Sequence, residues 1–321
     1  MAHPLPPPRH DMADGHDFVK YEALGNDYLV IAPAAGQVAP TPENIRLICD
    51  RHYGPGADGV LYGPLPEEHG FGLRTFNSDG TECEQSGNGL RIFGRYLHDH
   101  GWTGEPEFTV RTPAGPVTVQ LVDQARGPDA PAAACPGSGR TGAGAGDGAP
   151  VRVSMGRASL DSELIGATGP RREMLRETLQ EPGREWTATC VFLGNPHCVL
   201  PLEGTEVTEE LARRLGPVLA GHARFPGRIN VQLMEVRAAD RIRIETYERG
   251  AGYTLASGSS ACAAAVAAHA LGLTGPEVTV EMPGGDLAVG ISDAGEVTLT
   301  GPVRPVVAGR WTPAFRRRLA S

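Results

Sequence analysis

Two serine–glycine segments in this chain of 321 residues have the residue types and spacing of a reactive or anion-binding site. Ser86 begins SGNGLRIFGRYL and Ser257 begins SGSSACAAAVAA, so each opens an apolar run with helical spacing. The first backbone N–H groups of a helix lack partners within the helix and attract anions. The pattern therefore predicts two helix N-termini that hold a small carboxylate from both sides. A second interpretation stays open, because serine is also a favoured helix N-cap.

Polar residues that are unusual for a core collect around these segments. Several amides and a Glu–Arg pair together can bind an ammonium and a carboxylate, which means an amino acid, and an arginine fork suits a second carboxylate. Asn is also a common turn residue, so their number rather than any one of them supports a site. The candidates are Asn26, Asp27, Asn77, Asn88, Asn195, His197, Asn230, Glu248 and Arg249.

The same segments recur along the chain at a nearly constant offset. The separation between Ser86 and Ser257 is almost the same as that between Leu24, which begins LGNDYLV, and Leu193, which begins LGNPHCV. The segments GWTGEPEFTVRTPAG and GLTGPEVTVEMPGG begin at the same separation as the two serines. Three landmarks in the same order at nearly one offset indicate an internal duplication.

Each repeat places its serine at the start of a predicted helix. Apolar spacing after Asn88 predicts the first helix, and the Ala-rich segment 261–271 predicts the second, so we expect one buried helix in each half. Alternating or β-branched runs predict strands at 108–110, 117–122, 151–153, 188–193, 230–236, 241–247, 278–281 and 296–299. The sequence therefore predicts an α/β (α+β) fold of two similar pseudo-twofold domains. Each is expected to be a curved, mostly antiparallel sheet around a central helix, with the active site in the interdomain cleft.

Composition sets the expected domain boundaries. Residues 1–16 are rich in Pro and His, and residues 126–150 contain 11 Gly or Pro, so we expect a disordered tail and a Gly/Pro/Ala-rich loop. The segments that remain predict an N-terminal domain at 17–125 and a C-terminal domain at 151–303. Both are near the usual domain size of roughly 150 residues.

Charge and hydropathy exclude several classes of partner. The chain has 29 Lys and Arg against 38 Asp and Glu, a formal net charge of −9, whereas nucleic-acid binding usually needs a basic face. No apolar stretch reaches the roughly 18 residues of a membrane helix, and the N-terminus lacks the apolar core of a signal peptide. We expect a cytoplasmic protein that binds a small molecule and neither nucleic acid nor a membrane.

The sequence predicts neither a metal nor an organic cofactor. The six cysteines are dispersed without a C-x-x-C pair, and no glycine-rich phosphate loop with a lysine follows a predicted strand. The single lysine, Lys20, is expected to be exposed on the first strand, which does not suit a Schiff base to pyridoxal phosphate.

Taken together, these motifs resemble those of the diaminopimelate epimerases, a family of cofactor-independent amino-acid racemases, over residues 17–312. The matching segments are ALGNDYLVI, RHYGPGADG, FNSDGTECEQSGNGLRIF, GNPH, RINV, ERGAGYTLASGSSACAAA and MPGG. The resemblance implies two similar α/β domains with the active site between them, and a C-terminal segment 304–321 that returns to the first domain. It also implies a homodimer, which the family often forms.

The resemblance implies a two-base mechanism, in which one group removes the Cα proton of an amino acid and another delivers a proton to the opposite face. The family uses cysteine at both positions, which here are Ser86 and Ser257. By resemblance, the distal end of the substrate is held by Asn77, Asn195, Asn230, Glu248 and Arg249, and the reacting end by Asn26, Gly87, Asn88, Gly258 and Ser259. His197 and Glu248 are the implied neighbours that tune the two bases.

The two serine segments depart from the family at further positions. Tyr253 replaces a usual Glu, and Ser259-Ser260 replace Thr-Gly. Of the nearby thiols, Cys262 is expected to pack in the core, whereas Cys83 has no assigned role. A serine hydroxyl is a far weaker acid than a thiol and becomes a useful base only through a strong partner. A serine pair is therefore expected to be much slower.

We predict an isomerase that interconverts LL- and meso-2,6-diaminopimelate for lysine and cell-wall precursor biosynthesis. Two alternatives remain open. A divergent isomerase or lyase that acts on a related amino acid predicts a different product, and for a lyase no interconversion of epimers. A catalytically inactive amino-acid-binding homologue predicts binding without exchange of the α-proton.

Overall fold

The computed structural model of the chain describes residues 16–33, 38–122, 149–181 and 184–319. The predicted tail at 1–16 and the predicted loop at 126–150 therefore lie almost entirely outside the described residues. The described residues form two compact units. Of the described residues, the first unit contains 16–33, 38–122, 149–153 and 301–319, and the second contains 154–181 and 184–300.

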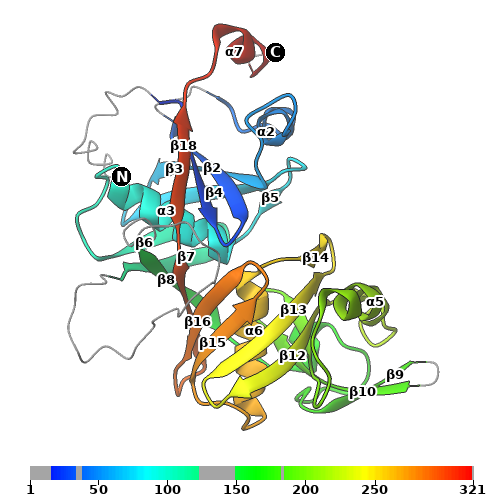
Figure 1. The fold of residues 1–321 in the computed structure, drawn as a ribbon. Helices are drawn as coiled ribbons and strands as arrows, with labels where there is room; N and C mark the ends of the chain where they lie inside the picture. Colours follow the sequence, from blue (N-terminus) through cyan, green and yellow to red (C-terminus); the bar gives the residue numbers. More distant parts are fainter. Residues whose placement is uncertain (1–15, 34–37, 123–148, 182–183, 320–321) are drawn as a thin grey trace. The chain divides into compact units, whose positions relative to one another are not determined.

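The first unit is built on a mixed sheet (Figure 1). Neighbouring strands follow the order β18–β1–β2–β3–β4–β6–β7–β8, and β5 also pairs with β4. The pairs β2–β3 and β4–β6 are parallel and the others are antiparallel. The strands are β1 (Phe18–Ala23), β2 (Asn26–Ile31), β3 (Gly59–Pro66), β4 (Phe71–Asn77), β5 (Glu82–Cys83), β6 (Glu107–Thr112), β7 (Gly115–Leu121), β8 (Pro150–Arg157) and β18 (Arg304–Gly309).

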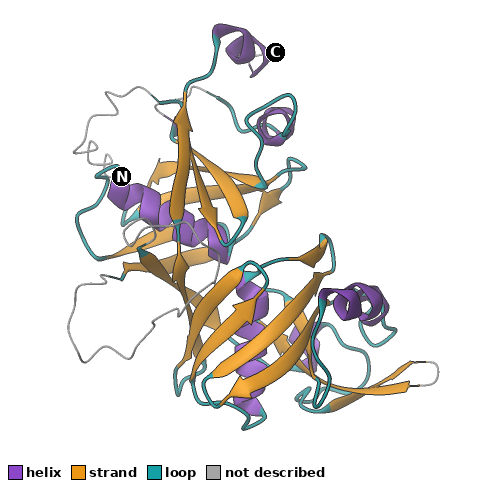
Figure 2. Cartoon of the chain, viewed as in Figure 1, coloured by secondary structure: helices purple, strands orange, loops and turns teal. Residues whose placement is uncertain are grey.

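Helix α3 (Gly87–Asp99) lies inside the first unit, surrounded by strands (Figure 2). It packs against β1, β2, β3 and β7, and its residues Leu90 and Phe93 are completely buried. The helix predicted from apolar spacing is thus confirmed. Two shorter helices, α2 (Pro42–Cys49) and α7 (Pro313–Leu319), add side chains to an apolar cluster of this unit that also contains Leu29, Val60 and Trp311.

The second unit repeats this plan (Figure 1). Its strands follow the order β9–β10–β11–β12–β13–β15–β16–β17, and β14 also pairs with β13. The pairs β11–β12 and β13–β15 are parallel. The strands are β9 (Glu177–Glu181), β10 (Arg184–Phe192), β11 (Pro196–Pro201), β12 (Asn230–Ala238), β13 (Arg241–Glu248), β14 (Gly252–Thr254), β15 (Glu277–Met282), β16 (Gly285–Ile291) and β17 (Glu296–Pro302).

Helix α6 (Gly258–Ala270) is the central helix of the second unit (Figure 2). It packs against β10, β11, β12, β13, β15 and β16, and its alanines let strands approach on all sides. Cys262 is completely buried in this helix, as expected. Helix α5 (Glu209–Ala220) packs against β12 and β13, and α4 (Ser162–Ile165) is a single turn.

The two units share one topology. The order β1–β2–α2–β3–β4–β5–α3–β6–β7–β8 corresponds element by element to β10–β11–α5–β12–β13–β14–α6–β15–β16–β17, and the two parallel pairs fall at equivalent places. The predicted duplication and mixed α/β fold are confirmed. The prediction of one helix per repeat missed α2 and α5. No helix in the described ranges is long and apolar enough to cross a membrane.

Candidate functional site

Ser86 caps the central helix of the first unit. Its Oγ accepts a hydrogen bond from the Gly89 N–H at 3.1 Å, as expected for an N-cap residue with an extended backbone. The Tyr28 hydroxyl, on β2, lies 3.3 Å from the same oxygen. Gly87 is the first helical residue, so backbone N–H groups without helical partners lie beside the serine. The Ser86 hydroxyl thus has both a helix N-terminus and a phenol as neighbours.

A chain of hydrogen bonds orients Asn26 and Asn88. Asn88 Nδ2 donates to Asn26 Oδ1 at 3.1 Å, and Asn26 Nδ2 donates to Asp58 Oδ2 at 2.9 Å. The completely buried Arg91 donates from Nη2 to Asn88 Oδ1 at 2.6 Å. Because an ionised carboxylate only accepts and a guanidinium only donates, Asp58 and Arg91 fix the orientation of both amides. Each amide nitrogen has a second N–H, which suits a carboxylate ligand.

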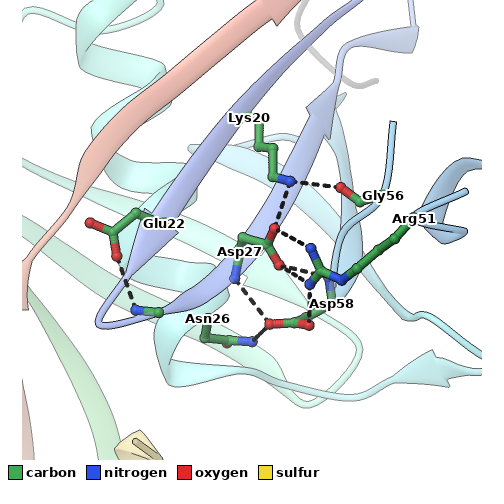
Figure 3. A network of polar contacts seen from close by, with 8 residues as sticks. Lys20, Glu22, Asn26, Asp27, Arg51, Gly56 and Asp58 are labelled. Atoms are coloured by element: carbon green, nitrogen blue, oxygen red, sulfur yellow. Dashed lines mark hydrogen bonds and ion pairs between the residues drawn. The ribbon is translucent and has the colours of Figure 1, made fainter. Parts of the chain in front are cut away.

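Asp58 belongs to a charged network beside the β1–β2 hairpin (Figure 3). Arg51 Nη2 lies 2.8 Å from both Asp27 and Asp58, and Lys20 Nζ lies 2.6 Å from Asp27. Burial alone would raise the pKa of Asp27, but hydrogen bonds from Arg51 and Lys20 outweigh it and lower the pKa to about 2. The expectation that Lys20 is exposed is wrong. Its side chain is 14% exposed, because it is held by Asp27 and the Gly56 carbonyl.

Asn77 and Cys83 lie on the β4–β5 hairpin. Asn77 is exposed, and its Nδ2 donates to Thr81 Oγ1 at 3.0 Å. Cys83 Sγ donates to the Gln85 carbonyl at 3.1 Å. Burial raises the pKa of Cys83, so this thiol stays protonated near neutral pH and is poorly suited to act as a base.

Ser257 has the equivalent place in the second unit. It caps α6, its Oγ accepts from the Ser260 N–H at 3.5 Å, and Gly258 and Ser259 are the first two helical residues. Burial raises the pKa of Glu248, at the end of β13, and a hydrogen bond with Ser257 lowers it in part. A carboxylate that accepts a hydrogen bond from a serine hydroxyl is an arrangement that can make the hydroxyl act as a base.

His197 is completely buried on β11. Its Nε2 lies 2.6 Å from Asn195 Oδ1. Burial lowers the pKa of His197 to about 3, a contact with Gln232 opposes this change, and the charge of Arg249 adds to it. Gln232, on the neighbouring strand β12, donates from Nε2 to Ser260 Oγ in the first turn of α6 at 3.0 Å. At neutral pH the imidazole is therefore uncharged.

Asn230 holds the turn that carries Glu248 and Arg249. Its Oδ1 accepts from the Arg249 N–H at 3.0 Å, and its Nδ2 donates to the Pro196 carbonyl at 3.2 Å. The Arg249 side chain is exposed and donates to the Gly227 carbonyl at 3.5 Å. These contacts give Asn230 a positioning role and leave the guanidinium accessible to a ligand.

Tyr253, on β14, is held by neighbours in its own unit. Its hydroxyl donates to Glu245 Oε2 at 2.7 Å, and Arg243 Nη2 lies 3.1 Å from Glu245 Oε1. The Arg213 guanidinium lies over the Tyr253 ring, 4.5 Å from its centroid. The phenol therefore acts as a hydrogen-bond donor to the buried Glu245 carboxylate of β13.

Each unit brings some of its predicted site residues together. Ser86 adjoins Asn88, which contacts Asn26, and Ser257 contacts Glu248. Within the described ranges no group of three or more His, Cys, Asp or Glu side chains could hold a metal ion. The repeat could have drawn attention to Tyr28, since LGNDYLV aligns it with the histidine of LGNPHCV. The contacting residues that the sequence analysis missed are Tyr28, Asp58, Arg91 and Gln232.

The chain is similar to known proteins along most of its length. The diaminopimelate epimerase family profile matches residues 18–128 and 189–306. Diaminopimelate epimerase 2 of Nostoc sp. strain PCC 7120 is 43% identical over 293 residues, which cover 91% of this chain and 94% of that protein. Diaminopimelate epimerase of Moorella thermoacetica is 36% identical over 294 residues, covering 91% of this chain and 98% of that protein.

The fold has counterparts among more distant solved structures. A hydroxyproline epimerase from Agrobacterium vitis has a TM-score of 0.62 and 16% sequence identity, and the match covers 93% of this chain and 94% of that one. A probable proline racemase from Agrobacterium radiobacter K84 also has a TM-score of 0.62, at 14% identity, covering 92% of each chain. At these identities the likeness concerns the fold alone.

Proposed function

Since this chain belongs to the diaminopimelate epimerase family, we propose that it is an isomerase that interconverts LL- and meso-2,6-diaminopimelate. One structural observation supports this proposal for the present chain. Ser86 and Ser257 cap the central helices of two units with the same topology, at the positions where the family resemblance implies the two proton-transfer groups.

The two serines have different partners, which supports different roles in the proposed reaction. An interaction with Ser257 lowers the pKa of Glu248 in part, and we propose that this carboxylate takes the hydroxyl proton while Ser257 removes the Cα proton. Ser86 is the group proposed to return a proton. The N–H groups of Gly87 and Gly258 and the amides of Asn26 and Asn88 suit the charge on the reacting amino-acid end.

The remaining parts of the proposal concern the distal substrate end and the setting. Arg249, whose guanidinium is exposed, suits the second carboxylate of diaminopimelate. The proposed binding set is completed by Asn77, Asn195, Asn230, Glu248 and Ser259. The buried, neutral His197 is proposed to adjust the pKa values of the two proton-transfer groups. We place the reaction in lysine biosynthesis in the cytoplasm, and propose a homodimer, which size-exclusion chromatography with light scattering would test.

The proposal is tested by product analysis. Purified protein is incubated with LL-diaminopimelate, and the epimers are separated by chiral chromatography. Formation of meso-diaminopimelate supports the proposal, and Ser86→Ala and Ser257→Ala are each expected to reduce it at least about 100-fold. Thr208→Ala is the matched control, because Thr208 caps α5 in the same manner and is absent from the proposed site. Formation of a different product would instead favour a divergent isomerase or a lyase.

An amino-acid-binding protein without turnover is the second candidate function. It is favoured by the observation that both serine hydroxyls already serve as helix N-caps. Calorimetric binding of meso-diaminopimelate, with no meso-to-LL conversion in the same sample, would favour this candidate over the isomerase.

A further inference from the structure

We propose that Tyr28 donates a hydrogen bond to Ser86 and thereby holds Ser86 as the proton-donating hydroxyl of the reaction. The catalytic role of this hydrogen bond rests on the proposed function, whereas the hydrogen bond itself does not. The Tyr28 hydroxyl lies 3.3 Å from Ser86 Oγ, and Tyr28 is 7% exposed. It is a positioning residue, because it acts through the oxygen of Ser86.

The hydrogen-bond capacity of the serine oxygen supports this direction. A hydroxyl has one O–H donor and two acceptor positions. The Gly89 N–H already fills one acceptor position of Ser86 Oγ at 3.1 Å. When the phenol fills the other, the serine hydrogen is the group left to point toward a substrate. Ser86 is then arranged to give a proton.

The chain makes room for the phenol at a specific glycine. Tyr28 lies opposite Gly59 where β2 and β3 pair. A Cβ at position 59 would lie 2.6 Å from Tyr28 Cε1 and 2.4 Å from the Phe76 carbonyl oxygen, so a side chain there would displace the ring. The absence of a side chain at Gly59 therefore allows the ring to occupy the place from which its hydroxyl reaches Ser86.

In the second unit the serine hydroxyl has the opposite hydrogen-bonding role. There we assign Ser257 as a donor to the Glu248 carboxylate, whereas we assign Ser86 as an acceptor from Tyr28. In the proposed step, the Ser86 O–H bond breaks as a new Cα–H bond forms on the carbanion. The electron pair of the O–H bond stays on Ser86 Oγ, and the Tyr28 hydroxyl stabilises that charge. In the reverse direction the same oxygen takes the proton back.

The contact can be tested without any substrate. In a Ser86→Cys/Cys83→Ser background, the pKa of the thiol introduced at position 86 is obtained from its rate of alkylation by iodoacetamide at different pH values. Because a phenol donor stabilises a thiolate, adding Tyr28→Phe is expected to raise this pKa by about one unit. Cys83→Ser removes the half-buried thiol nearest in sequence, which would otherwise contribute to the signal.

Tyr21→Phe is the matched control. Tyr21 is the cross-strand partner of Tyr28, and its hydroxyl donates to Asp99 at the other end of α3, at 3.1 Å. This variant also loses one phenol hydrogen bond to the same helix, but is expected to leave the pKa of the introduced thiol within about 0.3 units. An unchanged pKa in Tyr28→Phe, or equal shifts in the two variants, would overturn the proposed contact.

Turnover then tests the role of the contact. Tyr28→Phe in the otherwise unmodified protein is expected to lower kcat about 10-fold with little change in KM, whereas Tyr21→Phe changes neither by more than about two-fold. An unchanged kcat in Tyr28→Phe would overturn the role. If the unmodified protein forms no product, the proposed function fails, while the thiol titration still decides whether Tyr28 donates to position 86.

Discussion

Tyr28 and His197 occupy the same place in the two repeated units. Each is the first residue of its parallel strand pair, Tyr28 opposite Gly59 and His197 opposite Asn230. The phenol contacts the hydroxyl that caps α3, whereas the imidazole contacts Asn195 Oδ1 at 2.6 Å. The duplication thus retained the backbone pairing while the side chains at this place diverged, and we expect the two units to differ in their proton chemistry.

His197 is expected to make the fold less stable in mild acid. Burial keeps its pKa near 3 in the folded protein, below the ordinary value of about 6.5 in the unfolded chain. The unfolded state therefore binds one more proton as the pH falls through 6.5, and folding stability is lost. Urea unfolding should show a loss of about 2 kcal/mol from this group between pH 7 and pH 5. His197→Gln should remove that part of the pH dependence, and identical pH dependences would contradict the assignment.

Glu248 is expected to set the acid side of the activity profile. Burial raises the pKa of this carboxylate, and only the ionised form accepts the Ser257 proton. Activity should therefore fall as the pH decreases through a value above the ordinary Glu pKa of about 4.3. Glu248→Gln should lower kcat about 100-fold or more. Glu245→Gln, which changes a buried carboxyl on the same strand, should retain the acid-side decline. The same decline in Glu248→Gln would assign it to another group.

Arg91 is expected to be important for stability. Its guanidinium is completely buried and donates to Asn88 Oδ1 and, at 3.1 Å, to the Pro302 carbonyl. Arg91→Met leaves both acceptors without this donor and should lower the free energy of unfolding by about 3 kcal/mol. Arg46→Met, which removes an exposed ion pair on α2, should cost less than about 1 kcal/mol. Chemical denaturation compares the two, and similar costs would argue against a special role for Arg91.

Tyr253 cannot be exchanged alone for the glutamate that the family resemblance implies. Its hydroxyl donates to the buried Glu245 carboxylate, so Tyr253→Glu would place two carboxyl groups together. Their repulsion raises the pKa of one of them, and the variant should lose about 1–3 kcal/mol of stability as the pH rises from 5 to 7. Tyr253→Phe should lose a smaller, pH-independent amount. Thermal unfolding at both pH values separates the two, and parallel behaviour would contradict the explanation.

The main architecture could be predicted because it depends on local patterns. Apolar spacing after Asn88 and the alanines after Ser257 identified the two central helices, and the recurring segments identified the duplication. Helices α2 and α5 were missed although each has a local signal, Thr41 before a proline at the first position and Thr208 before two glutamates.

Long-range contacts could not be predicted from these patterns. Tyr28 and Ser86 are 58 residues apart, and Arg91 reaches the carbonyl of Pro302 across 211 residues. Lys20 was expected to be exposed because its neighbours in sequence do not reveal the carboxylate that the hairpin brings to it. The family motifs predict the site positions, but the orientation of the Asn26 and Asn88 amides depends on Asp58 and Arg91.

Proton exchange at Cα is the most direct test of the central claim that the chain moves this proton with two serine hydroxyls. The protein and its Ser86→Cys/Ser257→Cys variant are each incubated with LL- and then meso-diaminopimelate in heavy water, and loss of the Cα proton is followed by NMR. We predict slow exchange with epimerisation in the unmodified protein and faster exchange in the variant. No exchange in the unmodified protein would contradict a working serine pair, and no exchange in either protein would contradict diaminopimelate as the substrate.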